Sequence, residues 1–340
     1  MNIRFLLVCL FSCYSLFAIA TDKATPKEGE GIYRFLLNNG RNPKEHFDEF
    51  VALNKNKLGK NHSLIKGVSY VLPATANNNI TNNPISSNNN TSPGNKKREP
   101  LFGKKYAEYT INSNKLKGAT FFLVSGHGGP DCGAIGTADG KEIHEDEYAY
   151  DIMLRLARCL MMEGATVHII IQDKHDGIRD DKFLKNNKKE TCGGKDIPLN
   201  QVKRLQQRCD EINRLSRRSK NKYQRAIFIH LDSRSNNKQL DVYFYHHGKS
   251  TEGKRLGNTM RTTFRGHYQK HQPDRGFTGT VSARDLYVLT NTTPVGLFAE
   301  LGNIRNSFDQ RRFLLDSNRQ ALANWMCRGF IIDYENSKKK

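Results

Sequence analysis

The sequence lacks a cysteine pattern that could define a disulfide framework. It has seven cysteines in 340 residues, and two of them, Cys9 and Cys13, lie in the first 20 residues. The other five are odd in number and irregularly spaced: Cys132, Cys159, Cys192, Cys209 and Cys327. This excludes a small fold stapled by disulfides. A single bridge between Cys192 and Cys209 stays open, because sequence alone cannot decide it.

Acidic residues are scarce relative to basic ones. The chain has 34 Asp and Glu against 54 Lys and Arg, for a net charge of +20. Such an excess says little about the fold and points to a polyanionic partner. The candidates are nucleic acid, anionic lipid headgroups and an acidic cell envelope.

A long apolar segment is also missing after residue 20. Residues 1–20, MNIRFLLVCLFSCYSLFAIA, have a short start with Arg4, a brief apolar run from Phe5 and an Ala-Ile-Ala end. This is the form of a cleaved signal peptide, and the run is short for an uncleaved anchor. A lipoprotein box ending at Cys13 is a minor alternative, since Phe11 fits it poorly. We expect an exported protein, periplasmic or secreted, with no stable membrane span and no nucleic-acid partner.

Three zones follow the signal segment. Residues 29–73 contain two helical patterns and the alternating stretch GVSYVLP, which predict a small α+β module. Residues 74–100 are rich in Asn, Ser and Pro and nearly devoid of apolar side chains, which predicts a linker. Residues 101–335 alternate strand and helix patterns. They predict a three-layer α/β domain with a mostly parallel central sheet flanked by helices.

Within the third zone, six apolar stretches predict strands and four amphipathic stretches predict helices. The strands are expected at 118–127, 165–171, 225–232, 240–247, 285–289 and 295–302, and the helices at 146–162, 199–217, 251–271 and 309–326. Residues 173–196 form a long polar insertion after one of these strands. An insertion of that length is typical of a functional lid or a disordered loop.

Three ionisable residues stand where apolar strands end. His127 follows FFLVSG, His230 follows AIFI, and Glu300 follows VGLFA. A buried polar group without a partner costs roughly 2–7 kcal/mol. One such histidine would indicate a core hydrogen bond, but three at one rim of a sheet favour a metal or catalytic site.

A fourth candidate, Glu145, lies at the start of the helix expected at 146–162. Glu142, Asp146 and Glu147 are rivals by position, because acidic residues favour the first turn of any helix. Two histidines and a carboxylate with an open fourth position describe a catalytic zinc site. Bound zinc lowers the pKa of its water to near 7 and polarises a carbonyl, and a nearby carboxylate can shuttle the proton. The residues alone therefore predict metal-assisted amide hydrolysis.

Five sequence blocks carry a resemblance to a known family. They are SGHGGPDCGAIG, EDEYAYDIMLRLA, QRCDEIN, IFIHLDS and FAELGNIRN, in this order between about residues 119 and 322. They resemble the zinc-dependent N-acetylmuramoyl-L-alanine amidases that act on bacterial cell walls. The resemblance implies hydrolysis of the amide between N-acetylmuramic acid and L-alanine in peptidoglycan.

The resemblance also implies a role for each candidate residue. His127, Glu145 and His230 correspond to the ligands of Zn²⁺, and counting back from LRLA selects Glu145 over its rivals. Glu300 corresponds to the catalytic general base and acid, acting on a zinc-bound water. Arg208 and Asn213 correspond to residues with structural roles. Where the family usually has Asp, this chain has Ser125, and Asp232 is a candidate hydrogen-bond partner for a ligand histidine.

Residues 29–73 resemble a lysin-motif module, which binds peptidoglycan. A wall-binding module on a flexible linker would raise the effective concentration of substrate. Two alternatives remain: a zinc peptidase that cuts within the stem peptide, and a non-catalytic peptidoglycan-binding regulator. The sequence leaves the oligomeric state open.

Overall fold

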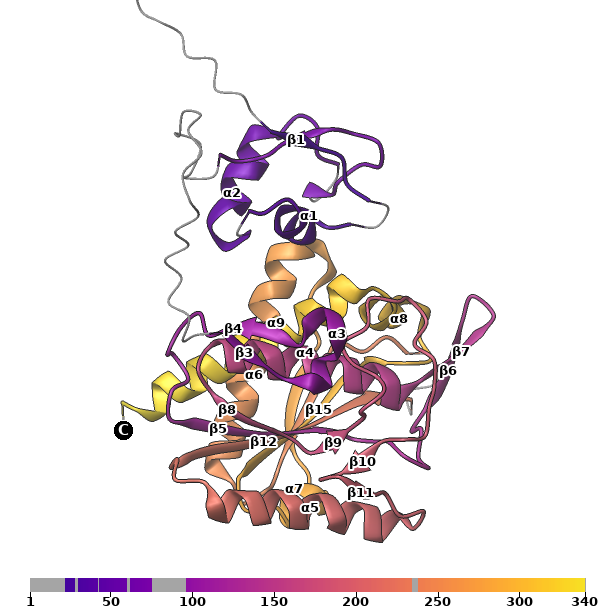
Figure 1. Cartoon of the computed structure of the whole chain (residues 1–340), viewed down its shortest axis with the longest axis vertical. Helices are drawn as coiled ribbons and strands as arrows, with labels where there is room; N and C mark the ends of the chain where they lie inside the picture. Colours follow the sequence, from indigo (N-terminus) through magenta and orange to yellow (C-terminus); the bar gives the residue numbers. More distant parts are fainter. Residues whose placement is uncertain are drawn as a thin grey trace, which may run out of the picture. The chain divides into compact units, whose positions relative to one another are not determined.

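Figure 1 shows a computed structural model of the chain, which describes residues 22–27, 30–41, 43–59, 62–74, 96–233 and 238–339. The chain divides into two compact units, Met1–Ser87 and Asn88–Lys340, and each is described by itself. The predicted signal peptide and most of the predicted linker lie outside the described residues. Among the described residues, no helix is long and apolar enough to span a bilayer.

The first unit has two helices and a short two-stranded sheet. Helices α1 (Ile32–Asn38) and α2 (Pro43–Leu53) pack on β1 (Lys23–Ala24) and β2 (Tyr70–Val71), which pair in antiparallel fashion. Its buried core is Ile32, Phe35, Leu36, Phe50, Tyr70 and Leu72. The buried side chain of Asn54 bonds both main-chain groups of Val71 at 2.8 Å and so joins the end of α2 to β2.

The second unit begins with structure inside the predicted linker. Strand β3 (Lys96–Arg98) pairs with β4 (Glu108–Thr110), and the short helices η3 (Pro100–Phe102) and α3 (Gly103–Tyr106) lie between them. The linker boundary at residue 100 is therefore set too late. The three basic residues of β3 give no apolar strand pattern, because this strand is exposed. Its main chain is instead held by pairing with β4.

A six-stranded sheet forms the centre of the second unit. Its order is β14-β13-β15-β12-β5-β8, and every neighbouring pair is parallel except β13–β15. The prediction of a mostly parallel sheet is confirmed. The strands are β5 (Ala119–Ser125), β8 (Thr166–Ile169), β12 (Tyr223–Asp232), β13 (Tyr243–His246), β14 (Thr280–Ala283) and β15 (Val295–Asn303).

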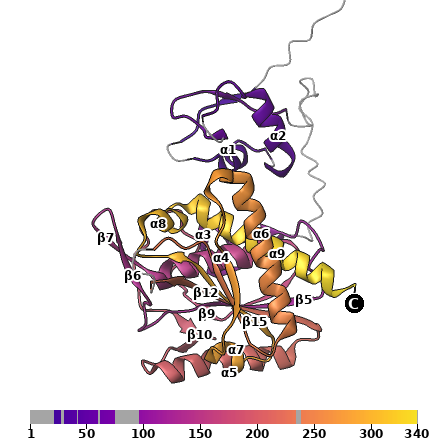
Figure 2. The same ribbon diagram turned by 180° about the vertical axis from the view of Figure 1, so that it is seen from behind.

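Helices cover both faces of this sheet, as Figures 1 and 2 show. Alternate strand residues face opposite sides: Phe121 and Ile227 join one apolar cluster, whereas Phe122 and Phe228 join the other. The first cluster lies under α4 (Glu145–Met162), α6 (Thr251–His271) and α9 (Asp316–Ser337), and the second under α5 (Gln201–Arg218) and α7 (Tyr287–Thr290). Helices η4 (Pro273–Arg275) and α8 (Ser307–Leu314) complete the unit.

Two element predictions are wrong. Residues 285–289 do not form a strand but lead into helix α7, because Val288 and Leu289 are both buried in the same cluster, which an alternating strand would not allow. The helix predicted at 309–326 is two helices, α8 and α9, separated by Leu315 in an extended conformation.

The polar insertion at 173–196 is an ordered part of the domain. It contains β10 (Thr191–Cys192) and β11 (Lys195–Asp196), which form a small sheet with β9 (Ile171–Gln172). Its Ile178 and Leu184 are buried in the main core. The expectation of a disordered loop is therefore wrong, because a few buried apolar side chains hold an otherwise polar segment in place. Cys192 and Cys209 are both buried free thiols.

Candidate active site

The two strand-end histidines meet at one edge of the sheet. Strands β5 and β12 are parallel neighbours with Ser125 opposite Ile229, so His127, two residues beyond the end of β5, comes close to His230, which is still within β12. The rings of His127 and His230 lie 4.8 Å apart between centroids, edge to face. The parallel register therefore joins two residues that are far apart in sequence.

A tight hairpin brings Glu145 to the same place. Strands β6 (Ile135–Ala138) and β7 (Lys141–His144) are joined by Asp139 and Gly140, both with positive φ, as a two-residue hairpin turn requires. The chain thus returns to the loop after β5, where Ala134 bonds Glu145 twice. The amide of Glu145 donates to the carbonyl of Ala134 at 2.9 Å, and the amide of Ala134 donates to the Glu145 carboxylate at 2.8 Å.

The three side chains fit a single divalent ion. Glu145 Oε1 lies 3.0 Å from His230 Nδ1 and 3.4 Å from His127 Nε2, and one donor atom from each residue lies within 4.8 Å of the others. Tetrahedral zinc with bonds near 2.1 Å holds its ligand atoms about 3.4 Å apart. Two imidazole nitrogens and a carboxylate oxygen are donors that suit zinc.

Two glycines make room for this arrangement. A Cβ on Gly126 would lie 1.8 Å from His230 Nε2, and one on Gly133 would lie 2.7 Å from Glu145 Oε2. No other residue type fits at Gly126 without moving the imidazole. The glycines around His127 thus create the space in which the other candidate ligands lie.

Of the four acidic residues near the start of α4, only Glu145 reaches the histidines. Glu142 lies on the hairpin with 71% of its side chain exposed. Asp146 and Glu147 are buried in a separate acidic cluster with Glu190. The geometry therefore separates candidates that sequence chemistry left equivalent.

Burial and charge set the protonation of the three side chains. Burial raises the pKa of Glu145, but the two histidines outweigh it and hold that pKa below its usual range. Burial also lowers the pKa of His230. Burial opposes protonation of His127 as well, but the carboxylates of Glu145 and Asp131 raise its pKa overall. A metal ion would have to displace this proton, since only neutral imidazole is a ligand.

Glu300 lies on the neighbouring strand, directly opposite His230 in the register of β12 and β15. Paired residues of adjacent parallel strands point to the same face, about 4.8 Å apart. Phe298, two residues earlier on that face, stacks on the His230 ring with centroids 4.2 Å apart. Glu300 is 6% exposed and is the register partner of His230, a candidate ligand.

The sequence analysis missed Asp131 as a contact of a candidate ligand. Asp131 Oδ2 lies 2.9 Å from His127 Nδ1 and accepts from Arg204 at 2.7 Å. The structure shows for Asp131 the kind of contact that the sequence analysis proposed for Asp232, which stays a candidate for the same role. The position of Asp131 four residues after His127, in the same glycine-rich block, is a signal that could have identified it.

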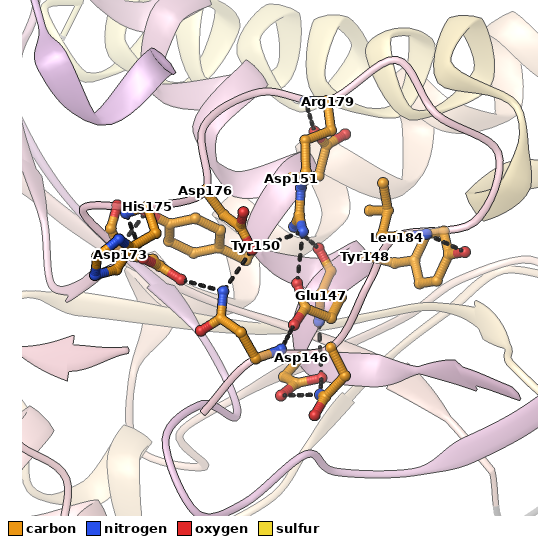
Figure 3. Close-up of polar contacts among 12 residues, drawn as sticks. Asp146, Glu147, Tyr148, Tyr150, Asp151, Asp173, His175, Asp176, Arg179 and Leu184 are labelled. Atoms are coloured by element: carbon orange, nitrogen blue, oxygen red, sulfur yellow. Dashed lines mark hydrogen bonds and ion pairs between the residues drawn. The ribbon is translucent and has the colours of Figure 1, made fainter. Parts of the chain in front are cut away.

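The 173–196 segment also contacts the loop after β5, which carries His127. Glu190 accepts a hydrogen bond from the amide of Gly129 at 2.8 Å, two residues from His127. Figure 3 shows the adjoining network, in which Arg179 pairs with Glu147 at 2.8 Å at the start of α4. The main chain of Asn187 also donates to Glu147, at 2.7 Å. No local sequence signal identifies Glu190, because its contact joins residues far apart in the chain.

A pocket of about 190 Å³ opens beside the two histidines. Its apolar wall comes from α5, α7, β12 and β15 and includes Leu205, Phe228, Leu286, Val288 and Phe298. Its charged wall consists of Asp131, Arg204 and Arg208. Asn213, further along α5, instead holds the loop after α7 through Asn291 and Thr293.

Comparison with known proteins agrees with the resemblance noted from the motifs. Residues 122–331 match the sequence model of a family described as N-acetylmuramoyl-L-alanine amidase. No curated protein matches the sequence.

Several solved structures are similar to this chain. The N-acetylmuramoyl-L-alanine amidase from Clostridium difficile 630 is 20% identical, with 67% of this chain and 99% of that one covered and a TM-score of 0.45. AmiC2 of Nostoc punctiforme is 21% identical, with 66% and 99% covered and a TM-score of 0.44. Ami1 from Mycobacterium smegmatis is 17% identical, with 65% and 99% covered and a TM-score of 0.48. Because the family model spans more than half of the sequence, this chain belongs to the N-acetylmuramoyl-L-alanine amidase family.

Proposed function

We propose that this chain is a zinc-dependent amidase that hydrolyses the bond between N-acetylmuramic acid and L-alanine in peptidoglycan. Family membership supports the choice of bond. The observation that carries the metal dependence is the convergence of His127, Glu145 and His230 within 4.8 Å. The donor set and the space left by Gly126 and Gly133 both suit zinc.

Each residue then has a distinct task. Zinc, when bound, supplies a Lewis acid and lowers the pKa of a coordinated water. Asp131 accepts a hydrogen bond from Nδ1–H of His127, which leaves the lone pair of Nε2 available to a metal ion. Glu300 takes the proton of the attacking water and delivers it to the leaving nitrogen, so that the amide bond breaks without forming an amide anion.

We further propose that residues 29–73 act as a lysin-motif-like module that binds peptidoglycan. The module has its own buried core, from Ile32 to Leu72, so it can bind independently of the catalytic unit. The predicted linker, shortened to the part before β3, would tether it and raise the local concentration of wall polymer. Residues 1–20 would direct export to the cell envelope, where this substrate occurs.

The test is to identify the products that the purified protein releases from isolated cell wall. An amidase frees intact stem peptides that begin with L-alanine and leaves bare glycan. A chelator should abolish release and added zinc should restore it. Peptides cut within the stem would instead indicate a peptidase, and wall binding without any product would indicate a regulator.

A further inference from the structure

The pocket beside the candidate metal centre contains an arginine without a counter-ion. Arg208 is 1% exposed and lines the pocket. One of its Nη atoms donates to the carbonyl of Arg204 at 3.1 Å. Its Nε and other Nη atoms have no hydrogen-bond partner among the described residues. A buried cation is thus held beside the site without the pairing that buried charges normally have.

Among the described residues, no acid pairs directly with this charge. Asp131 is the carboxylate in the same pocket, and it is already engaged by Arg204 and His127. An unpaired buried ion costs several kcal/mol. Burial accordingly lowers the pKa of the Arg208 guanidinium. A bound divalent metal would add further positive charge, so the pocket attracts an anion.

The remaining walls limit the size and character of that anion. They are apolar, formed by side chains such as Leu205, Val288 and Phe298, and the pocket holds about 190 Å³. This is smaller than the 300–1,000 Å³ typical of pockets for drug-sized ligands. The pocket therefore suits a single residue with a short aliphatic part and a carboxylate. Low-dielectric walls strengthen the attraction between that carboxylate and Arg208.

We propose that this pocket is the subsite for the acidic stem-peptide residue that follows L-alanine, and that Arg208 recognises its free carboxylate. The proposal rests on the amidase function. It also orients the substrate, since carboxylates lie on the peptide side of the scissile amide while the sugar side carries hydroxyl and acetamido groups. The peptide would enter between α5 and α7, with the glycan on the opposite side of the metal centre.

The test compares two soluble muropeptides that differ only in whether this carboxylate is free or amidated. The wild-type protein should cleave the free acid with a kcat/KM roughly tenfold or more above the amide, as expected for a charge-assisted contact. Arg208→Met should bring the ratio close to one. Arg214→Met is the matched control: Arg214 lies on the same helix, is 42% exposed and pairs with Glu211, so its loss should leave the ratio unchanged.

Two further measurements separate recognition from a structural role and from failure of the amidase function. Arg208→Met should keep or raise Tm, because it removes an unpaired buried cation, whereas a structural arginine would lower Tm on removal. Calorimetry with the acidic stem peptide alone should show weaker binding to Arg208→Met than to wild type. Equal cleavage of both muropeptides by wild type, or an unchanged ratio in Arg208→Met, would overturn the subsite. If neither muropeptide is cut but the peptide still binds through Arg208, the amidase proposal fails and the subsite stands.

Discussion

Small residues and charged residues in the loop after β5 have separate tasks at the candidate centre. Because Gly126 has no side chain, the ring of His230 can occupy the adjacent space, and Gly133 leaves space for Glu145 in the same way. Asp131 fixes the ring of His127 through Nδ1. Single substitutions can therefore fill the space for a ligand, release the orientation of a ligand ring, or remove a reacting group. These three effects can be measured separately.

Replacing Glu300 with alanine should stop the reaction without releasing the metal. Glu300 is not among the three convergent donors, so zinc content should stay near wild type. Loss of a general base and acid typically lowers kcat by about 10²–10⁴. Metal content by atomic absorption and kcat on a soluble muropeptide check this. His127→Ala is the control that should lose zinc, and near-normal turnover by Glu300→Ala would remove Glu300 from the mechanism.

Gly126→Ala should lower zinc affinity although no ligand is changed. The added Cβ would occupy the position of the His230 ring, which must then move. A displaced ligand should cost at least as much affinity as loss of an outer contact, which is about 10- to 100-fold. Competition with a chromophoric chelator measures it. Gly266→Ala in α6 is a useful comparison, because nothing lies within 4 Å of the added atom and Gly266 does not have a positive φ. Equal zinc affinity in Gly126→Ala and wild type would show that the imidazole is free to move.

At the scale of elements, the 173–196 segment is a support for the site. It places Glu190 against the amide of Gly129 and binds the first turn of α4 through Arg179 and Asn187. The loop after β5 carries His127, and α4 begins with Glu145. The 173–196 segment therefore holds these two candidate ligands in place relative to each other. Burial, opposed by the Gly129 hydrogen bond, raises the pKa of Glu190 to about 7.

Glu190→Gln should change how stability depends on pH. A carboxyl whose pKa is higher in the folded state than in the unfolded state favours folding while protonated. This contribution is fully present below about pH 4.5 and is lost as pH rises to about 7. Glutamine keeps an acceptor for Gly129 and cannot ionise. The variant should therefore gain stability over wild type between pH 4.5 and 7, by about 1–3 kcal/mol at the upper end.

Urea unfolding of both proteins at a series of pH values measures this difference. Contributions of groups that do not interact with Glu190 cancel in the comparison, whereas loss of the Glu190 charge also removes one cause of the raised pKa of Asp146. A difference that does not vary with pH would mean that Glu190 stays ionised in the folded protein. Glu190→Ala, which removes the acceptor, should also reduce zinc affinity, and Glu190→Gln should retain it.

At the scale of the whole molecule, two units with separate cores share one chain. The first has the cluster from Ile32 to Leu72, and the second has the two clusters on the faces of its sheet. All candidate catalytic and metal-binding residues belong to the second unit. The net charge of +20 favours association with a polymer that bears carboxylates.

Deleting residues 29–73 should weaken binding to insoluble wall and spare the chemistry. Loss of the tethered module removes its contribution to effective concentration, so activity on insoluble wall should fall roughly tenfold or more. The kcat/KM on soluble muropeptides should stay within about twofold of wild type. Co-sedimentation with purified wall is the direct measurement. Unchanged sedimentation of the deleted protein would reject the lysin-motif interpretation.

The sequence by itself determined the class of fold and the residue types of the candidate centre. Strand and helix periods are local properties, and they located β5, β12 and β15 and the polar residues in or just after their C-terminal halves. Short elements were less predictable. The apolar run at 285–289 leads into helix α7 rather than a strand, because in so short a stretch packing against α5 outweighs the local sequence pattern.

Only the tertiary structure decided which polar groups meet. Glu145 and His230 are 85 residues apart, and Glu190 and Gly129 are 61 apart. Nothing in local composition distinguishes Glu145 from its acidic neighbours, or Arg208 from the other arginines of α5. The register of parallel strands and the return of the hairpin set those distances. Whether a buried charge finds a partner is likewise a property of the packed chain, because it depends on every segment that surrounds the charge.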